Sequence, residues 1–536
     1  MTARTRGALF AIAGIAALLR FWGLTYGLPH PAARPDEDLV VGKALKISLG
    51  EMRDPRDFNY SHGVYYLHAA VLAAYRGVGH VLGVYPDAGS FLDDVFVERP
   101  ALQYRICRTS TALMGVATTL LAAWAAWEGY RRRSAALLAG LLVAVNFLHV
   151  RDSHFGTVDV PMTLFATLSL VFSFRAGRHQ LRRDYVLGGL CAGLATSAKY
   201  NAVTIVFALA AATLTPLRHG TPPERRRAVG SLALAAAASI LAFALTSPYC
   251  VLRLPDFLAG VAVQRRELFD GAGEAAWRVH LRLTLPGAFG FIGLAAAAFG
   301  IVRSLWLRRP ADLIILAFMI PTFASLAEIT WVQARYMIPL VPPLAILAAE
   351  TTAALVPPGP TWMAVATLLL VIEPLRNTIA FDRLAAREDT RLLAASWIDE
   401  HLPPHARIAA CEGYGAPAIN TDKRRPPAFE PLKVPCSVDA IQDTGARYVV
   451  THAHPDIPFF RPSGRILRWL NTHAKPLAVF DPVGNAKGLR HCFFQGDAFY
   501  LPYCRFESVE RGGPAVTVWD LGWAASPPSD HSARVP

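Results

Sequence analysis

Long apolar runs follow one another through the first 376 residues of this chain. An α-helix needs roughly 17 to 25 mostly apolar residues to cross the hydrocarbon core of a bilayer. Runs that approach or reach this length lie near residues 7–24, 109–128, 134–150, 160–175, 185–200, 201–217, 229–246, 284–302, 311–329, 336–356 and 360–376. Only 17% of the residues are charged, whereas soluble domains carry about 25%. The sequence therefore predicts an α-helical multi-span membrane protein with about 11 transmembrane helices.

The formal charge of +13 does not indicate a nucleic-acid surface, because the basic residues are not gathered with stacking aromatics on one folded face. They cluster between the apolar runs instead, at Arg131–Arg133, at Arg175, Arg178, Arg182 and Arg183, at Arg225–Arg227, and at Arg303, Arg308 and Arg309. Lys and Arg in short loops mark the cytoplasmic side of a membrane protein. We therefore expect the N-terminus and these loops inside, and the turns at 151–159, 199–201 and 330–335 outside.

The segment 62–84 is apolar but contains His62, His68, Arg76 and His80. If it crossed the membrane, every later span would invert, and a charge at the bilayer centre costs roughly 2.5 to 3.5 kcal/mol. We expect it to lie as an amphipathic helix in the outer interface, inside a large first outer loop from 25 to 108. The first run could instead be a secretory signal peptide, but it lacks a clear small-residue cleavage site and continues into RFWGL.

The outer turns carry ionisable residues next to the membrane, where such groups are candidates for function. Asp36 and Glu37 follow the first run, Asp159 opens the fourth, Lys199 stands between the fifth and sixth, and Arg335 precedes the tenth. A carboxylate can accept a proton from an attacking hydroxyl, while cations hold a departing phosphate. These residues predict sugar transfer from a phosphate-linked carrier, with inversion of the anomeric centre if the displacement is direct.

The order of a first span, P-D-E-D, a long outer loop, Asp159, K-Y-N, S-P-Y and A-R-Y-x-x-P-x-x-P resembles the GT-C class of glycosyltransferases. It is most similar to glycosyltransferase family 39, which includes the protein O-mannosyltransferases and the lipid A aminoarabinose transferase. The resemblance covers about residues 7–376 and, more loosely, the tail. It implies an enzyme that takes a monosaccharide from a polyprenyl-phosphate donor and transfers it to a protein, lipid or glycan acceptor at the outer membrane face.

By motif position, the resemblance implies that Asp36 is the catalytic acid or base, that Glu37 positions Asp36 or the acceptor, and that Asp159 orients a sugar. Charge makes Lys199 and Arg335 candidate ligands of the carrier phosphate. Further candidate substrate contacts are Tyr249 of S-P-Y, Tyr336 of A-R-Y, and His62, which with Ser61 stands where relatives have prolines. As structural alternatives, Asp36 and Glu37 could be solvated loop acids, Asp159 could cap a helix, and Lys199 and Arg335 could extend to the interface.

No metal-binding motif such as H-x-x-x-H or C-x-x-C is present, so no cofactor is predicted, and a divalent cation is left open. Two other functions compete with a glycosyltransferase: a transporter or lipid flippase, and a non-catalytic membrane scaffold. A transporter usually has internally repeated, broken helices around a site at mid-membrane. We find no clear internal repeat, and the acids lie at span ends.

Residues 388–536 differ from the membrane domain at 1–387, because amphipathic helices there alternate with the short β-type runs ARIAAC, ARYVVTH and PLAVFD. This order predicts a small α/β domain. With an odd number of spans the domain is extracytoplasmic, on the outer face of a cell inner membrane. Four of the seven cysteines, Cys411, Cys436, Cys492 and Cys504, lie in it, which favours one or two disulfides of undetermined pairing.

Overall fold

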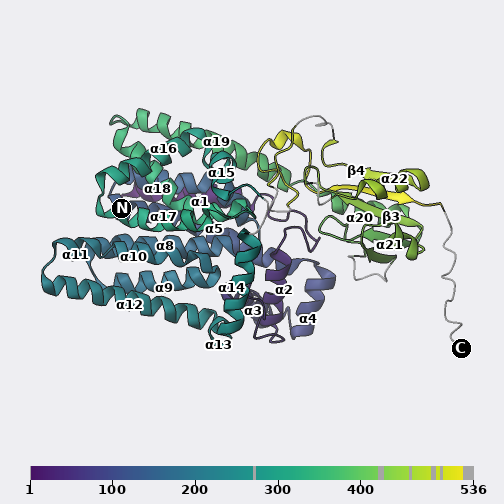
Figure 1. Ribbon diagram of the computed structural model, residues 1–536, viewed down its shortest axis with the longest axis horizontal. Coiled ribbons are helices and arrows are strands. Elements are labelled where there is room, and N and C mark those ends of the chain that lie inside the picture. Colours follow the sequence, from purple (N-terminus) through teal and green to yellow (C-terminus); the bar gives the residue numbers. More distant parts are fainter. Residues whose placement is uncertain are drawn as a thin grey trace. The chain divides into compact units, whose positions relative to one another are not determined.

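The computed structural model describes residues 2–269, 273–420, 428–457, 461–484, 490–494 and 499–522. The chain forms two compact units (Figure 1). The membrane unit comprises Met1–Leu24, Leu39–Val78 and Ile106–Asp382. The second unit comprises Thr25–Asp38, Gly79–Arg105 and Arg383–Pro536, so it combines the C-terminal region with two earlier segments.

The membrane unit is helical. Its α-helices, some of which extend past the unit's boundaries, are α1 (Ala3–Phe21), α2 (Glu37–Ser48), α3 (Gly63–Val81), α5 (Leu102–Tyr130), α6 (Arg133–Val145), α7 (Phe147–Ser153), α8 (Asp159–His179), α9 (Arg182–Ala198), α10 (Val206–Ala211), α11 (Leu214–His219), α12 (Pro222–Thr246), α13 (Pro248–Leu252), α14 (Leu254–Phe269), α15 (Ala276–Val279), α16 (Leu285–Leu307), α17 (Pro310–Ala327), α18 (Val341–Leu355) and α19 (Pro360–Ala385). Three short helices with other hydrogen-bond spacing join them: η2 (Tyr200–Ile205), η3 (His280–Thr284) and η4 (Ala334–Leu340).

Each of the expected apolar runs overlaps a helix, and the predicted multi-span helical architecture is confirmed. Within the described residues, 8 helices are long and apolar enough to cross a membrane, or 9 if α6 and α7, bent by 55°, form one span. The predicted number of about 11 is not confirmed. Two expected spans, α1 and α9, are not among these helices. Helix α1 contains three charged residues, Arg4, Arg6 and Arg20. Helix α9 has only 17 residues, and it begins with Arg182, Arg183 and Asp184.

Arg20 shows how a charge is accommodated inside the membrane unit. Its guanidinium is fully buried and donates to the carbonyls of Val143 and Ala144, both at 3.1 Å, where α6 ends. The last carbonyls of a helix lack intrahelical partners, and a buried one must be satisfied by another donor. Arg20 thus stabilises the bend between α6 and α7.

Helix α9 packs between α8 and α12 (Figure 1). Its contact with α12 depends on two glycines four residues apart, because a Cβ on Gly189 would lie 2.1 Å from the carbonyl oxygen of Ala235, and one on Gly193 would lie 2.2 Å from that of Ser239. Small residues at this spacing let membrane helices approach at backbone distance. The close packing fixes the end of α9 that carries Lys199.

The second unit contains a five-stranded sheet of strand order β2-β1-β3-β5-β4. The strands are β1 (Arg407–Cys411), β2 (Glu430–Val434), β3 (Tyr448–Ala453), β4 (Lys475–Phe480) and β5 (Ala515–Asp520). β1 pairs in parallel with β2 and β3, whereas β5 is antiparallel to both β3 and β4. The unit's other helices are α4 (Ala88–Asp93), η1 (Asp94–Glu98), α20 (Thr390–His401), α21 (Val438–Asp443), α22 (Gly464–His473) and η8 (Phe506–Ser508).

Alternation along the strands divides the core between the two faces of the sheet. On one face, Ile408 and Val450 pack against Ala394 and Ile398 of α20. On the other face, Ala409, Val449 and Trp519 pack against α21 and α22 through residues that include Ile441, Ile466 and Leu470. The predicted α/β domain is confirmed, and the runs ARIAAC, ARYVVTH and PLAVFD form β1, β3 and β4.

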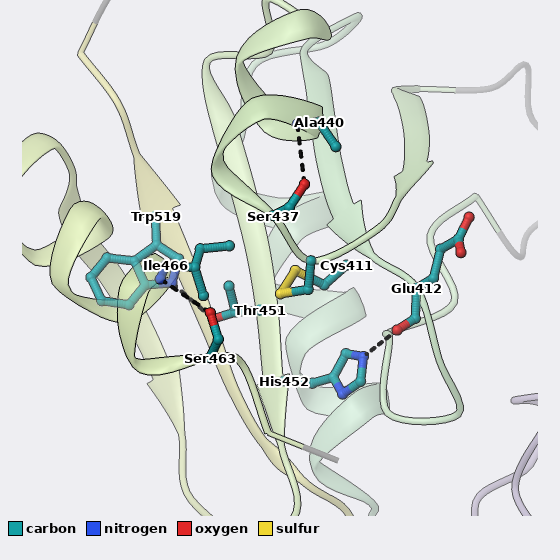
Figure 2. Close-up of a disulfide and its surroundings, with 10 residues drawn as sticks. Cys411, Glu412, Ser437, Ala440, Thr451, His452, Ser463, Ile466 and Trp519 are labelled. Carbon is teal, nitrogen blue, oxygen red and sulfur yellow. Dashed lines mark hydrogen bonds between the residues drawn. A yellow bond between two sulfur atoms is a disulfide. The ribbon is translucent and has the colours of Figure 1, made fainter. Parts of the chain in front are cut away.

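The cysteine count predicted one or two disulfides, and the structure contains two, Cys411 with Cys436 and Cys492 with Cys504. The first joins the end of β1 to the residues after β2. Figure 2 shows Cys411 beside the end of β3, where Trp519 donates from its indole nitrogen to the Thr451 hydroxyl at 2.9 Å.

Candidate functional site

Three of the predicted site residues come together in the membrane unit. Asp159, fully buried at the start of α8, accepts a hydrogen bond at 2.8 Å from the ammonium of Lys199 on its Oδ1 atom. The Nε atom of Arg335 lies 3.9 Å from the Oδ2 atom of Asp159. These three residues, which we call the cationic cluster, come from three separate turns of the chain.

Local structure explains why the three side chains meet. Lys199 directly follows α9 in an extended conformation, with φ of −155°, and its amide donates to the Ala195 carbonyl at 3.0 Å. Arg335 lies in η4, which packs against α8. The first turn of α8 is thus the meeting point of both basic residues.

The cationic cluster has one acid and two bases, so with all three ionised it carries a net positive charge. Buried charges are costly unless they are paired, and breaking such a pair by removing one partner typically costs about 3 to 5 kcal/mol. Among the described residues, none donates a hydrogen bond to Oδ2 of Asp159. The cluster therefore combines an excess of positive charge with a carboxylate oxygen that accepts no hydrogen bond from the described residues.

The aromatic residue next to Arg335 completes this arrangement. The Lys199 ammonium lies 4.9 Å from the centre of the Tyr336 ring, and Tyr336 is buried. A cation over an aromatic face is attracted by the ring's electron distribution. Tyr336 thus helps to fix the direction of the Lys199 side chain.

A cavity of about 600 Å³ lies in the same unit and is lined mainly by apolar side chains. Ser197 and Ala198, directly before Lys199, line it, as does Tyr249. Its lining residues are Ile47, Gly50, Met52, Arg53, Gly63, Val64, Tyr66, Leu67, Phe165, Leu194, Ser197, Ala198, Leu245, Thr246, Pro248 and Tyr249. A mainly apolar cavity of this size can hold part of a lipid chain.

Of the cavity's lining residues only Tyr249 was a predicted substrate contact, and Arg53 and Tyr66 are among those that were not predicted. Arg53 is exposed and is followed by Asp54, which pairs with Arg253 at 2.9 Å. Tyr66 donates its hydroxyl to the Arg53 carbonyl at 2.7 Å. Arg53 lies in a polar loop and Tyr66 in an apolar helix, so neither had a sequence signal that set it apart from its neighbours.

His62 lies outside the set of residues that line this cavity. Its buried ring donates from Nε2 to the Asp57 carbonyl at 2.9 Å and stacks on Phe58 with ring centres 5.2 Å apart. Burial lowers the pKa of His62 below its usual value. His62 therefore fixes the turn before α3, and its role as a substrate contact stays a prediction.

Asp36 and Glu37 belong to the second unit. Asp36 is half-buried and has φ of 70°, in the left-handed region that non-glycine residues seldom occupy. Glu37 follows as the first residue of α2 and is fully buried. Convergence of Asp36 with Asp159 in one cleft stays a prediction.

The carboxylates of Asp36 and Asp38 influence one residue of the C-terminal domain. Burial, with a smaller contribution from the negative charges of Asp38 and Asp36, raises the pKa of Tyr414. Tyr414 lies just after β1, at the carboxyl end of the parallel strands. That edge of an open parallel sheet is where α/β folds commonly bind ligands.

In the part of the chain that the structure describes, no group of three or more His, Cys, Asp or Glu side chains is placed to hold a metal ion.

Comparison with protein families gives a match over residues 105–251 to the dolichyl-phosphate-mannose-protein mannosyltransferase family. This segment runs from α5 to α13 and includes Asp159, Lys199 and Tyr249. No curated protein matches the chain.

Among solved structures, the chain is similar to ArnT from Cupriavidus metallidurans bound to undecaprenyl phosphate, with a TM-score of 0.52, 16% identity, and coverage of 96% of this chain and 98% of that one. The same protein in the apo state gives a TM-score of 0.50. The archaeal oligosaccharyltransferase AglB from Archaeoglobus fulgidus gives 0.49 at 13% identity, over 84% of this chain and 69% of that one. The likeness to ArnT over nearly the whole of both chains confirms the GT-C fold that the sequence motifs predicted.

Proposed function

We propose that this protein is an integral membrane glycosyltransferase that transfers a monosaccharide from a polyprenyl-phosphate donor to an acceptor on the outer face of the membrane. The matched family is named for dolichyl-phosphate mannose, and the similar ArnT structure has undecaprenyl phosphate bound. The observation that supports the proposal most directly is the cationic cluster, whose Lys199 follows residues that line a lipid-sized apolar cavity. No comparison points to a transporter.

Each residue of the cationic cluster has a distinct role in this proposal. Lys199 and Arg335 bind the carrier phosphate through charge-assisted hydrogen bonds. Asp159 holds Lys199 in place and accepts a hydrogen bond from a sugar hydroxyl on Oδ2. The apolar cavity receives the first isoprenoid units of the carrier, with Tyr249 and Tyr66 in its wall.

Asp36 is the proposed base. Its carboxylate takes the proton from the acceptor hydroxyl as that oxygen forms a bond to the anomeric carbon. The bond from the anomeric carbon to the phosphate oxygen breaks on the opposite side, and its electron pair leaves with the polyprenyl phosphate. One displacement from the opposite side inverts the anomeric centre, and Glu37 positions Asp36 or the acceptor.

The proposed location is a cell inner membrane, with the C-terminal domain outside. Two disulfides in that domain support an oxidising compartment, because cytosolic proteins seldom contain them. The basic loops that separate alternate apolar runs support a cytoplasmic N-terminus.

The test is release of polyprenyl phosphate from a polyprenyl-phosphate sugar by the purified protein, with a hydroxyl acceptor present. Arg335→Gln and Lys199→Gln should raise the KM for the donor by about 10- to 100-fold, because a hydrogen bond to a charged group contributes about 1.5 to 3 kcal/mol. Arg218→Ala is the control, since Arg218 is an exposed basic residue on α11.

The transporter would be favoured if the wild-type protein released no polyprenyl phosphate from the donor but still moved labelled lipid across a vesicle membrane. Unchanged donor KM in both variants would remove Lys199 and Arg335 from the phosphate site. Melting temperatures of the variants identify any loss that comes from unfolding.

A further inference from the structure

The loop Thr25–Asp38, which carries the proposed base, shares a compact unit with the C-terminal domain. Arg391 of α20 joins them. Its fully buried guanidinium donates from one nitrogen, Nη1, to the Ala32 carbonyl at 2.9 Å and to the Tyr414 carbonyl at 2.8 Å. A single nitrogen thus ties the loop to the residues that follow β1.

Asp389 fixes the direction of this guanidinium. Its two oxygens accept from Nε and Nη2 of Arg391 at 2.9 and 2.7 Å, and Oδ1 also accepts from the Arg391 amide at 2.9 Å. The Tyr500 ring lies 5.0 Å from the guanidinium carbon. A two-point pair of this kind sets orientation as well as distance, so Nη1 has little freedom to leave its two carbonyls.

A second contact holds the same loop. His30 donates from Nε2 to the Ala416 carbonyl at 2.8 Å, and its Nδ1 accepts from the Ala32 amide at 3.1 Å. Burial, then the charge of Arg391, lowers the pKa of His30 to about 3. His30 therefore stays neutral at physiological pH and keeps both hydrogen bonds.

Aromatic contacts cover the rest of the loop. The Tyr26 ring packs edge-on against Phe499 at 5.8 Å, and the Arg34 guanidinium lies 4.9 Å from the centre of that ring. A Cβ on Gly512 would lie 2.5 Å from the Tyr26 ring, so this face is closely packed. The loop is thus held along most of its length.

Only three residues separate Ala32 from Asp36, and Pro35, whose ring fixes φ, is one of them. Ala33, Arg34 and Pro35 are buried, and the Glu37 amide donates to the Arg34 carbonyl at 3.3 Å as α2 begins. Because this segment is short and buried, Asp36 can move little relative to Ala32.

We propose that Arg391 and Asp389, together with His30, are positioning residues that hold the Asp36 loop on the carboxyl edge of the C-terminal sheet. This proposal rests on the proposed function of Asp36 as the base. It assigns the C-terminal domain a part in catalysis, through Asp36. An Asp389–Arg391 pair that served only the core of that domain would affect turnover only through the amount of folded protein.

The first measurement is hydrogen exchange in the full-length protein, which needs no activity. Arg391→Lys keeps the charge but cannot reach both Asp389 oxygens and two carbonyls together. Exchange at Leu28, His30, Ala33 and neighbouring amides should become at least about tenfold faster, because the loop opens locally. Arg447→Lys is the matched control, since Arg447 forms a similar two-point pair with Asp520, at 2.9 Å on each side, in the same domain.

The second measurement is a double-mutant cycle on turnover. Arg391→Lys should lower kcat by about tenfold or more and leave the donor KM unchanged, because misplacement of a catalytic group costs rate. In an Asp36→Asn background it should change kcat by less than about twofold, since the two residues act through one group. His30→Ala leaves the Asp389–Arg391 pair intact and should behave like Arg391→Lys, which keeps the test valid if Arg391→Lys does not fold.

Unchanged exchange of the loop in both variants would overturn the proposal, and so would an equal fall in kcat with and without Asp36. If the wild-type protein released no polyprenyl phosphate from the donor, the proposed function alone would be contradicted. Hydrogen exchange of the loop amides would still decide whether Arg391 and His30 hold the loop.

Discussion

Among single residues, Asp36 is distinguished by its backbone. It has a left-handed backbone conformation, and it directly follows Pro35. Residues held in this region, glycine aside, tend to gather at functional sites, and Asp and Asn tolerate it best. Asp36→Asn therefore removes the charge with little change to the backbone, which few other substitutions would allow.

We expect Asp36→Asn to lower kcat by at least about a hundredfold, the lower range for loss of a positioned base. Donor affinity should stay close to wild type, because the proposed phosphate ligands are in the cationic cluster. Steady-state kinetics and equilibrium binding of polyprenyl phosphate measure the two effects separately. Retention of more than about a tenth of wild-type kcat would show that Asp36 is not the base.

The cationic cluster could be partly predicted from sequence, because Asp159, Lys199 and Arg335 occupy turns that parity placed on one membrane side. The ion pair between Lys199 and Asp159 could not be, since it depends on how α8 and α9 pack. The contacts of Arg391 gave no signal either, because they are made to backbone carbonyls, and any residue type can supply a carbonyl at Ala32 and Tyr414.

At the scale of helices and strands, α9 links packing in the membrane to the candidate site. Its glycines contact α12, and its last residues, Ser197 and Ala198, line the cavity next to Lys199. A shift of α9 away from α12 would move all three residues. The hydroxyls of Ser197 and Ser247, 2.7 Å apart, mark the same junction at the end of α12.

Gly193→Val should lower the melting temperature and raise the donor KM, because the new Cβ would overlap the Ser239 carbonyl and force the helices apart. Insertion of bulk into a packed interface typically costs about 1 to 3 kcal/mol. Gly230→Ala in α12 is the control, since a Cβ there meets nothing within 4 Å. Equal melting temperatures for the two variants would show that α9 and α12 tolerate separation.

The periodicity and length of the apolar runs predicted most of the helices and strands. The strands that they did not predict were missed for physical reasons. β2 (EPLKV) was missed because it is an edge strand with mixed polarity and only partial burial. β5 (AVTVWD) does alternate, but no helical segment precedes it as one precedes the other runs, so it fell outside the repeated pattern. A helix at 62–84 is confirmed as α3, whereas its place at the membrane interface stays a prediction.

At the scale of whole units, the stability of the second unit should depend on pH through buried histidines. His454 accepts on Nδ1 from the amides of Asp456 and Ile457, each at 3.0 Å, and donates from Nε2 to the Phe499 carbonyl. A proton added to Nδ1 would point at these two amide N–H groups, so protonation of His454 would break both hydrogen bonds. Burial is the main cause that lowers the pKa of His454 to about 4.

Because this pKa is lower in the folded state than the ordinary value near 6.5, the unfolded chain takes up a proton first as pH falls. The contribution of His454 to stability is therefore fully present above about pH 6.5 and is lost between about 6.5 and 4, with a total loss of ~3 kcal/mol. Hydrogen exchange of residues 448–457 in the full-length protein at pH 7.5, 6 and 5 would measure the loss after correction for intrinsic exchange rates. His454→Gln should flatten the profile, and an unchanged slope in that variant would assign the effect to other groups.

The partition into two units was beyond sequence reasoning, which placed a boundary near residue 387. A linear boundary cannot represent a unit that takes in Thr25–Asp38 and Gly79–Arg105 as well as the C-terminal region. The contacts responsible join residues more than 350 positions apart, such as His30 with Ala416. The local sequence of neither the Thr25–Asp38 loop nor the C-terminal region indicates these contacts.

The sheet order β2-β1-β3-β5-β4 also governs how the C-terminal domain can be made. β5 lies between β3 and β4, yet it leaves the ribosome after both of them. Until residues 515–520 emerge, β3 has one open edge and β4 has no neighbour, and exposed strand edges invite pairing with other chains. A nascent chain stalled before residue 515 would therefore present open edges to chaperones and proteases, whereas emergence of residues 515–520 would let β5 pair with both β3 and β4.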